Sequence, residues 1–133
     1  MKQEFSISDL AQEFDVSTRT IRYYEELGLL EPTRTAGGVR SFSKKDRARL
    51  RLILRGKRFG FSLDEIKEMI ELFDADLTGS KQLEQTIEYG KKRLREVNER
   101  IEELSELRSE MEEMLAEFAN RLAKLKEDGG DSQ

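Results

Sequence analysis

The 133-residue chain has no cysteine, no histidine and no tryptophan, and it has a single proline. Without cysteine the chain forms no disulfide and offers no thiolate to a metal or an oxidant, and without histidine it lacks the commonest acid–base catalyst. No apolar run approaches the length of a membrane span, and the opening residues MKQEFSIS contain no signal-peptide core. We therefore expect a cytoplasmic protein with no metal, no cofactor and no membrane partner.

Charge is abundant but unevenly distributed. Charged residues make up 39% of the chain and the net charge is −4. Residues 1–62 carry 13 Lys and Arg against 8 Asp and Glu, a net charge of +5, whereas residues 63–133 carry 11 against 20, a net charge of −9. Ten basic residues and one acid, Asp46, lie between Arg34 and Arg58. This segment indicates binding to a polyanion, with a solvated basic helix face as the alternative.

Two short helices joined by a tight turn are predicted near the start of the chain. Ser8 is the expected N-cap of the first helix, and Ser17 is the expected N-cap of the second. Ile21, Tyr24 and Leu27 share one face of the second helix, and the glycine at position 28 suits the left-handed position that ends a helix. This pattern is typical of a helix-turn-helix.

A hairpin and two further helices are predicted next. The segment TRTAGGVRSF (residues 33–42) predicts a β-hairpin, a wing that can lie along a DNA strand. Ser43 with Asp46 predicts a capping box that opens a helix over residues 44–57, whose basic side chains share a narrow arc. Ser62 with Glu65 predicts another capping box, at the start of a helix that ends near residue 73. Between these helices, Phe59 and Phe61 are expected in the core rather than as stacking platforms.

The second half of the chain has the pattern of a coiled coil. Thirteen positions from Leu83 to Leu125 alternate spacings of 4 and 3, and eleven of them are apolar. A helix with so long an apolar stripe needs a partner, and a second copy of the chain is the simplest one. The expected dimerisation residues are Leu83, Ile87, Leu94, Val97, Ile101, Leu104, Met111, Leu115 and Phe118.

The chain at this point resembles the MerR family of bacterial transcription regulators. The matching motifs are SISDLAQEFDVSTRTIRYYEELGLL, GGVRSFSKKDRARLRLI and GFSLDEIKEMIEL, followed by the predicted coiled coil. The resemblance implies a mainly α fold, in which a winged helix-turn-helix DNA-binding domain (residues 1–73) and a linker (74–80) precede a dimerisation helix (81–126). Residues 127–133 read as a disordered tail.

The family further implies a homodimer with antiparallel dimerisation helices, bound to double-stranded DNA at a pseudo-palindromic promoter. In this family the promoter spacer is bent and untwisted so that RNA polymerase can engage both promoter elements. The stretch DRARLRLILRGKRFGFSL more narrowly resembles regulators of branched-chain amino acid and fatty acid catabolism, which implies an effector such as an acyl-CoA.

The candidate DNA-binding residues lie on the second helix, the hairpin and the end of the third helix. We expect Arg19 or Arg22 to read a base edge, since arginine can pair bidentately with guanine; contact with phosphates alone is the alternative. Tyr24 is expected to pack inward, and Tyr23 to reach the DNA backbone or to remain a plain surface residue. The resemblance makes Arg40 the wing arginine. The full set is Thr18, Arg19, Thr20, Arg22, Tyr23, Tyr24, Arg40, Arg55, Lys57 and Arg58.

Two residues of the coiled coil are candidates for an effector site. Arg108 occupies a position that normally holds an apolar residue, where it would either fix the register by pairing with a glutamate of the partner or meet an anionic effector. Met114, with its methionine and phenylalanine neighbours, would either adapt around an apolar ligand or simply pack in the coiled coil.

Taken together, the sequence predicts a dimeric, sequence-specific transcription regulator. Two other functions stay open: an architectural or recombination-accessory protein that bends DNA without an effector, and a coiled-coil adaptor whose basic domain binds another protein. An enzyme is not expected, because the chain has no phosphate-binding loop and its carboxylates lie along solvated helix faces.

Overall fold

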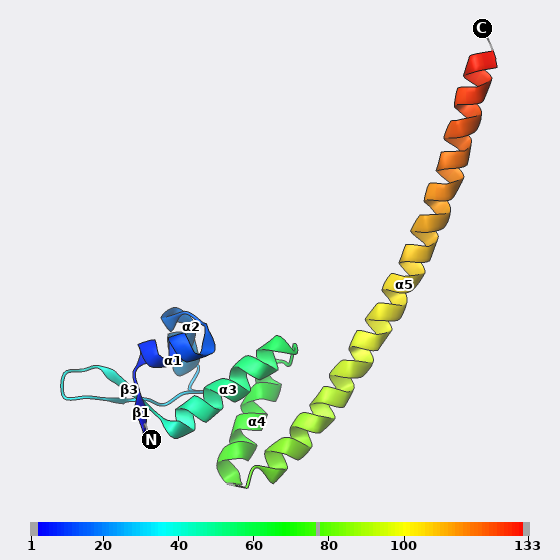
Figure 1. Cartoon of the computed structure of the whole chain (residues 1–133). Coiled ribbons are helices and arrows are strands. Elements are labelled where there is room, and N and C mark those ends of the chain that lie inside the picture. The colour runs from blue at the N-terminus through cyan, green and yellow to red at the C-terminus, as the bar shows by residue number, and fades with distance from the viewer. Residues whose placement is uncertain (1–2, 77, 132–133) are drawn as a thin grey trace. The chain divides into compact units, whose positions relative to one another are not determined.

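The computed structural model describes residues 3–76 and 78–131. In this part of the chain the order of elements is β1 (Glu4–Phe5), α1 (Ile7–Phe14), α2 (Thr18–Glu26), β2 (Thr33–Arg34), β3 (Arg40–Ser43), α3 (Lys44–Arg58), α4 (Leu63–Ala75) and α5 (Ser80–Asp131). The predicted fold class is confirmed: a winged helix-turn-helix domain is followed by a long C-terminal helix (Figure 1). The chain divides into two compact units, one ending at Arg93 and the other beginning at Leu94.

Serine capping boxes start three of the helices. The predicted boxes at the starts of α3 and α4 are confirmed, with Ser43 and Ser62 as the N-caps. The prediction that Ser8 caps the first helix is wrong, because α1 begins after Ser6. The Asp9 amide donates to Ser6 Oγ at 3.0 Å and the Ser6 amide donates to Asp9 Oδ2 at 2.9 Å, so this pair closes a third box.

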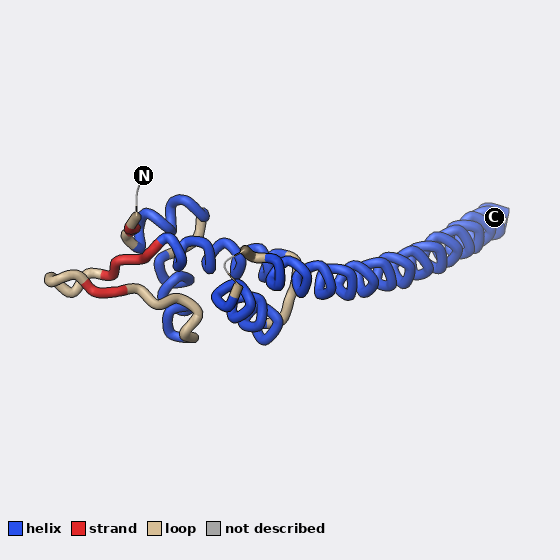
Figure 2. The backbone as a smooth tube through the Cα atoms, turned by 90° about the horizontal axis from the view of Figure 1, so that it is seen from below, coloured by secondary structure: helices blue, strands red, loops and turns tan. Residues whose placement is uncertain are grey.

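The hairpin belongs to a three-stranded antiparallel sheet. The strand order is β1-β3-β2, with Phe5 opposite Phe42 and Arg34 opposite Arg40. Figure 2 shows β2 and β3 side by side, joined by the loop that closes the hairpin. The sequence pattern predicts the hairpin but not the two-residue strand β1.

One apolar core holds the first unit together. Buried side chains come from every helix of the winged domain and from β3, whose Phe42 is fully buried. Removal of this apolar surface from water stabilises the unit. The core consists of Leu10, Ile21, Tyr24, Leu29, Leu30, Phe42, Leu50, Ile53, Ile66, Met69 and Ile70.

The first turns of α5 belong to this unit. Gln82 is buried, and the hydroxyl of Thr86 lies 3.1 Å from the sulfur of Met69 on α4. Tyr89 donates a hydrogen bond to the Glu68 carboxylate. The structure therefore differs from the predicted boundaries of 73 and 80, since α4 extends to residue 75 and α5 begins at residue 80 and packs on α4 at once.

The second unit is helical throughout its described part. The structure continues α5 to Asp131, so the predicted tail is helical over residues 127–131, and its last two residues lie outside the described part. The apolar stripe of α5 in the second unit is exposed in the single chain, with exposed fractions of its side chains from 39% at Val97 to 68% at Leu125. None of the described helices combines the length and the apolar character that a bilayer crossing needs.

Candidate nucleic-acid interface

The second helix of the helix-turn-helix presents cations on its surface and an aromatic ring to the core. Ser17 caps α2, its Oγ accepting the Thr20 amide at 3.1 Å. Arg19 and Arg22 are exposed in the first two turns. Their position at the N-terminal part of the second helix is the one that meets base edges in helix-turn-helix complexes.

The two adjacent tyrosines point in different directions, as predicted. Tyr24 is 5% exposed and lies in the core, while Tyr23 is 51% exposed. Burial is the main cause that raises the pKa of the Tyr24 phenol, and the neighbouring Tyr23 is a second cause in the same direction. Of the two, the Tyr23 ring is therefore accessible at the surface, and Tyr24 anchors α2 in the core.

The small hydroxyl residues of α2 are engaged locally. Thr20 and Ser17 share a hydrogen bond between their hydroxyls at 2.9 Å. The hydroxyl of Thr18 lies 3.4 Å from Arg22 Nη2, from which it accepts a hydrogen bond. Thr18 thus orients Arg22, one of the two arginines of which we expect at least one to read a base edge.

The wing holds one exposed and one paired arginine. On β2, Arg34 is exposed and its Nη1 donates to the Gly38 carbonyl at 3.0 Å, across the loop. On β3, Arg40 is only partly exposed, and its Nε donates to Glu25 Oε2 on α2 at 2.6 Å. The predicted wing arginine is therefore bound to α2, the second helix of the helix-turn-helix, which is called the recognition helix below.

Some of the basic side chains that share one face of α3, the basic arc, pair with an acidic side chain of the protein. Arg47 forms a salt bridge with Glu13 of α1 at 2.6 Å, and Arg51 lies 3.6 Å from the same carboxylate. The hydrogen bond from Arg47 is the main cause that lowers the pKa of Glu13. The guanidinium groups also lie over aromatic rings, Arg47 over Phe5 and Arg51 over Phe14. These cations fasten α1 to α3.

Other predicted DNA-binding cations have no such partner. The side chains of Arg55, Lys57 and Arg58 at the end of α3, like that of Arg19 on α2, are exposed and form no hydrogen bond or ion pair with any residue that the structure describes. Exposed cations without a protein counter-charge are free to neutralise phosphates.

The loop after α3 corrects one prediction. Phe59 is 54% exposed, so its assignment to the core is wrong; α3 ends at Arg58, and the Phe59 ring is left outside the packed surface. Phe61 is half-buried, as predicted, and its ring packs edge-on against Tyr89 at 6.2 Å between centroids. The exposed aromatic ring thus directly follows the unpaired cations.

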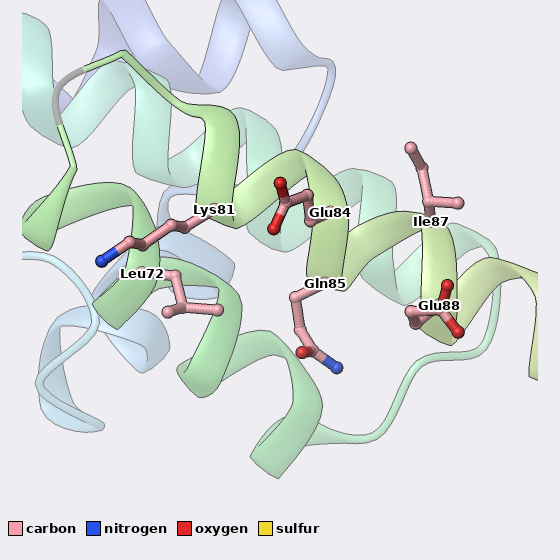
Figure 3. Close-up of a pocket in the computed structure, with 6 residues that line it drawn as sticks. All are labelled: Leu72, Lys81, Glu84, Gln85, Ile87 and Glu88. Carbon is pink, nitrogen blue, oxygen red and sulfur yellow. The ribbon is translucent and has the colours of Figure 1, made fainter.

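A groove lies between α4 and the first turns of α5. Its volume is about 670 Å³, and Figure 3 shows its lining side chains, with Leu72 from α4 and the others from α5. They are Leu72, Lys81, Glu84, Gln85, Ile87 and Glu88. The predicted effector residues Arg108 and Met114 do not line this groove and lie exposed on α5 in the second unit. In the described part of the chain no group of three or more acidic, histidine or cysteine side chains is placed to hold a metal ion.

Two family patterns match the chain, and both agree with the winged helix-turn-helix described above. The pattern of the MerR HTH family of regulatory proteins matches residues 5–72, and the MerR DNA-binding pattern matches residues 47–114. The chain belongs to the MerR family.

Individual relatives carry regulatory descriptions. The mercuric resistance operon regulatory protein of Bacillus cereus is 43% identical over 74 residues, which are 55% of this chain and 56% of that protein. The protein of the same description from Pseudomonas fluorescens is 32% identical over 99 residues, 74% of this chain and 65% of that protein. The chain thus spans between half and two thirds of the length of these relatives.

Two solved structures have a similar fold. A Listeria monocytogenes protein assigned to the MerR family superposes with a TM-score of 0.75 over 97% of this chain and 99% of its own, at 22% identity. HiNmlR, described as a MerR family regulator lacking the sensor domain and bound to promoter DNA, gives a TM-score of 0.54 at 28% identity, covering 74% of this chain and 79% of its own.

Proposed function

We propose that this chain is a sequence-specific DNA-binding transcription regulator. The observation that carries the proposal is the set of exposed, unpaired cations on α2 and at the end of α3, within a winged helix-turn-helix domain of the MerR family. The similarity to a family member described as bound to promoter DNA supports it. The descriptions of the family and of the relatives refer to regulation rather than to catalysis.

The regulator acts as a homodimer through α5. The apolar side chains at the heptad positions of the second unit are about half exposed in one chain, for example 58% at Ile101 and 59% at Leu115. A contiguous apolar stripe of this length is unfavourable in water and is covered when two such helices pair. The antiparallel sense of the pair and the distortion of the promoter spacer for RNA polymerase come with the family. We include both features in the proposal, together with a cytoplasmic location of the protein.

The descriptions of the relatives do not identify an effector for this regulator. Their descriptions refer to mercuric resistance, but soft metal ions select thiolate ligands and this chain has no cysteine. The narrower resemblance to regulators of branched-chain amino acid and fatty acid catabolism finds no support among these relatives. We therefore propose neither a metal nor an acyl-CoA as the effector.

Salt dependence of DNA binding tests the proposal. If about four phosphates are neutralised per chain, a dimer gives a log–log salt slope of about −7 on duplex DNA. Arg55→Gln should reduce the magnitude of this slope by about 1.8, since each dimer loses two cations. Arg51→Gln is the matched control: Arg51 lies on the same arc but near Glu13, so the slope should stay unchanged. Absence of duplex binding in dilute buffer would refute the proposal.

Sequence reading is tested separately at Arg22. Duplexes selected by the wild-type protein from a random library provide the specific target, and an unselected duplex of equal length provides the reference. Arg22→Ala should weaken binding to the selected duplex by about 1–3 kcal/mol and to the reference much less. An equal loss on both duplexes would mean that Arg22 contacts phosphate only.

A promoter transcription assay separates regulation from an architectural role, in which DNA bends but transcript levels stay constant.

A further inference from the structure

The hairpin places two arginines directly opposite each other. Arg34 and Arg40 are partners in the β2–β3 register, so their side chains lie on the same face of this short ladder. Like charges at such positions repel and destabilise the pairing of the strands. A hairpin with so few paired residues therefore needs a counter-charge for at least one of the two guanidinium groups.

Glu25 supplies this counter-charge from the recognition helix. Its Oε2 accepts the hydrogen bond from Arg40 Nε at 2.6 Å, and the two side chains are only 23% and 25% exposed. Partial burial shields the pair from solvent and salt, so the attraction is stronger than in a fully exposed pair. Arg34, in contrast, is exposed, and its side chain donates to the neutral carbonyl of Gly38 and forms no ion pair with any residue in the described part of the chain.

We propose that Glu25 is a positioning residue that holds the wing against the recognition helix through Arg40, and that Arg34 is the wing cation that contacts the DNA backbone. This inference rests on the proposed function and deepens it, because it divides the two wing arginines between two roles. Arg40 acts as a brace: a move onto a phosphate would break a shielded ion pair and leave the Glu25 carboxylate partly buried without its partner.

Conservative substitutions separate a brace from a phosphate contact. Arg40→Lys keeps the positive charge but replaces the fixed Nε donor by an ammonium on a flexible stem, so the geometry of a brace is weakened whereas a simple phosphate contact is largely kept. We expect Glu25→Gln, Arg40→Gln and Arg40→Lys each to weaken binding to the selected duplex by roughly tenfold, and the double Gln variant to be no weaker than either single Gln variant. Wild-type binding by Arg40→Lys, or additive losses in the double variant, would overturn the proposal.

The salt slope on an unselected duplex provides the matched comparison within the wing. Arg34→Gln should reduce the magnitude of the slope by about 1.8 per dimer, and Arg40→Gln should leave the slope at its wild-type value. A reduction by Arg40→Gln equal to that by Arg34→Gln would show that Arg40 contacts phosphate, contrary to the proposal.

Amide hydrogen exchange tests the brace without DNA. The Thr35 amide donates to the Val39 carbonyl at 2.8 Å and reports on closure of the wing. Glu25→Gln and Arg40→Gln should accelerate its exchange in the free protein, while exchange in α4 stays constant. Unchanged exchange would overturn the brace. If the wild-type protein bound no duplex, the proposed function would fail, yet this measurement would still decide whether Glu25 positions the wing.

Discussion

Arg93, on the first turns of α5, donates its Nε hydrogen to the main-chain oxygen of Phe59, 3.0 Å away. The bond joins the long helix to the loop that directly follows the unpaired cations Lys57 and Arg58. The next residue, Gly60, has a φ of +78°, and a Cβ at this position would lie 2.8 Å from Arg93 Nη2. The loop therefore depends on a glycine and on one arginine of α5.

Gly60→Ala should lower the free energy of unfolding by more than Gly28→Ala does. Gly28 has a similar φ of +77°, but a Cβ at position 28 would have no atom within 4 Å, so the control carries the backbone strain alone, about 1–2 kcal/mol. Gly60→Ala also displaces Arg93 from Phe59, at a further cost of about 1 kcal/mol. Chemical denaturation at one fixed protein concentration measures both. Equal losses would mean that the Arg93 bond does not stabilise the loop.

Asp46→Ala should be among the most damaging single substitutions in the first unit. Asp46 is 1% exposed, and its carboxylate accepts from the Glu31 amide at 2.9 Å and from the Ser43 amide at 3.2 Å. It also pairs with Arg49 at 3.5 Å, so its removal takes the acceptor from two partly buried amides and one of two carboxylates from the buried Arg49, at about 3–5 kcal/mol. Asp74→Ala is the control: Asp74 binds the same arginine at 2.8 Å but is 31% exposed. A larger loss at Asp74 in urea denaturation would contradict this ranking.

Alkaline pH should weaken the attachment of α5 to α4. The hydrogen bond to the Glu68 carboxylate is the main cause that raises the pKa of Tyr89 to about 12. Because the folded pKa lies above the ordinary value of 10, the stabilisation is complete below pH 10 and is lost as the pH rises toward 12. Absorbance titration of the phenols should show this late ionisation. It should disappear in Tyr89→Phe and move to lower pH in Glu68→Gln; an unchanged titration in Glu68→Gln would show that the carboxylate is not the cause.

Ile101→Asp should prevent pairing of the long helices. Ile101 is 58% exposed in the single chain and lies in the middle of the apolar stripe, where a buried carboxylate would have no partner. Asn120→Asp adds the same charge on the opposite side of the heptad pattern and should leave the dimer intact. Sedimentation velocity measures the oligomeric state. A dimer of the Ile101→Asp chain would show that the stripe is not the interface.

The features that the sequence predicts correctly depend on neighbouring residues. Ser43 and Ser62 predict the starts of α3 and α4 because each serine and its acidic partner lie three residues apart. The prediction of Ser8 as the cap of α1 is wrong although the same rule applies there, since Ser6 stands three residues before Asp9. Ser8 competes with Ser6 for this role, because a cap at Ser8 would place the Asp9 charge in the first turn, where the helix dipole also favours it.

The features that the sequence misses depend on partners far along the chain. The spacing of basic residues on α3 identifies their shared face, but it does not show that Glu13 lies opposite Arg47 and Arg51. Likewise the identity of Arg40 as a wing arginine gives no sign that Glu25 binds it. Charge patterns along one helix therefore indicate where cations gather, and only the tertiary structure separates those that pair within the fold from those left exposed.

The capping box at the start of α3 confines the beginning of that helix to four consecutive residues, Ser43 to Asp46. The loop of the wing, residues 35–39, lies upstream of this local signal. Lengthening or shortening the loop would alter the reach of the wing without shifting which side chains α3 turns toward the interior. Wing reach and interior packing can accordingly vary independently, so one scaffold can be fitted to targets of different groove shape.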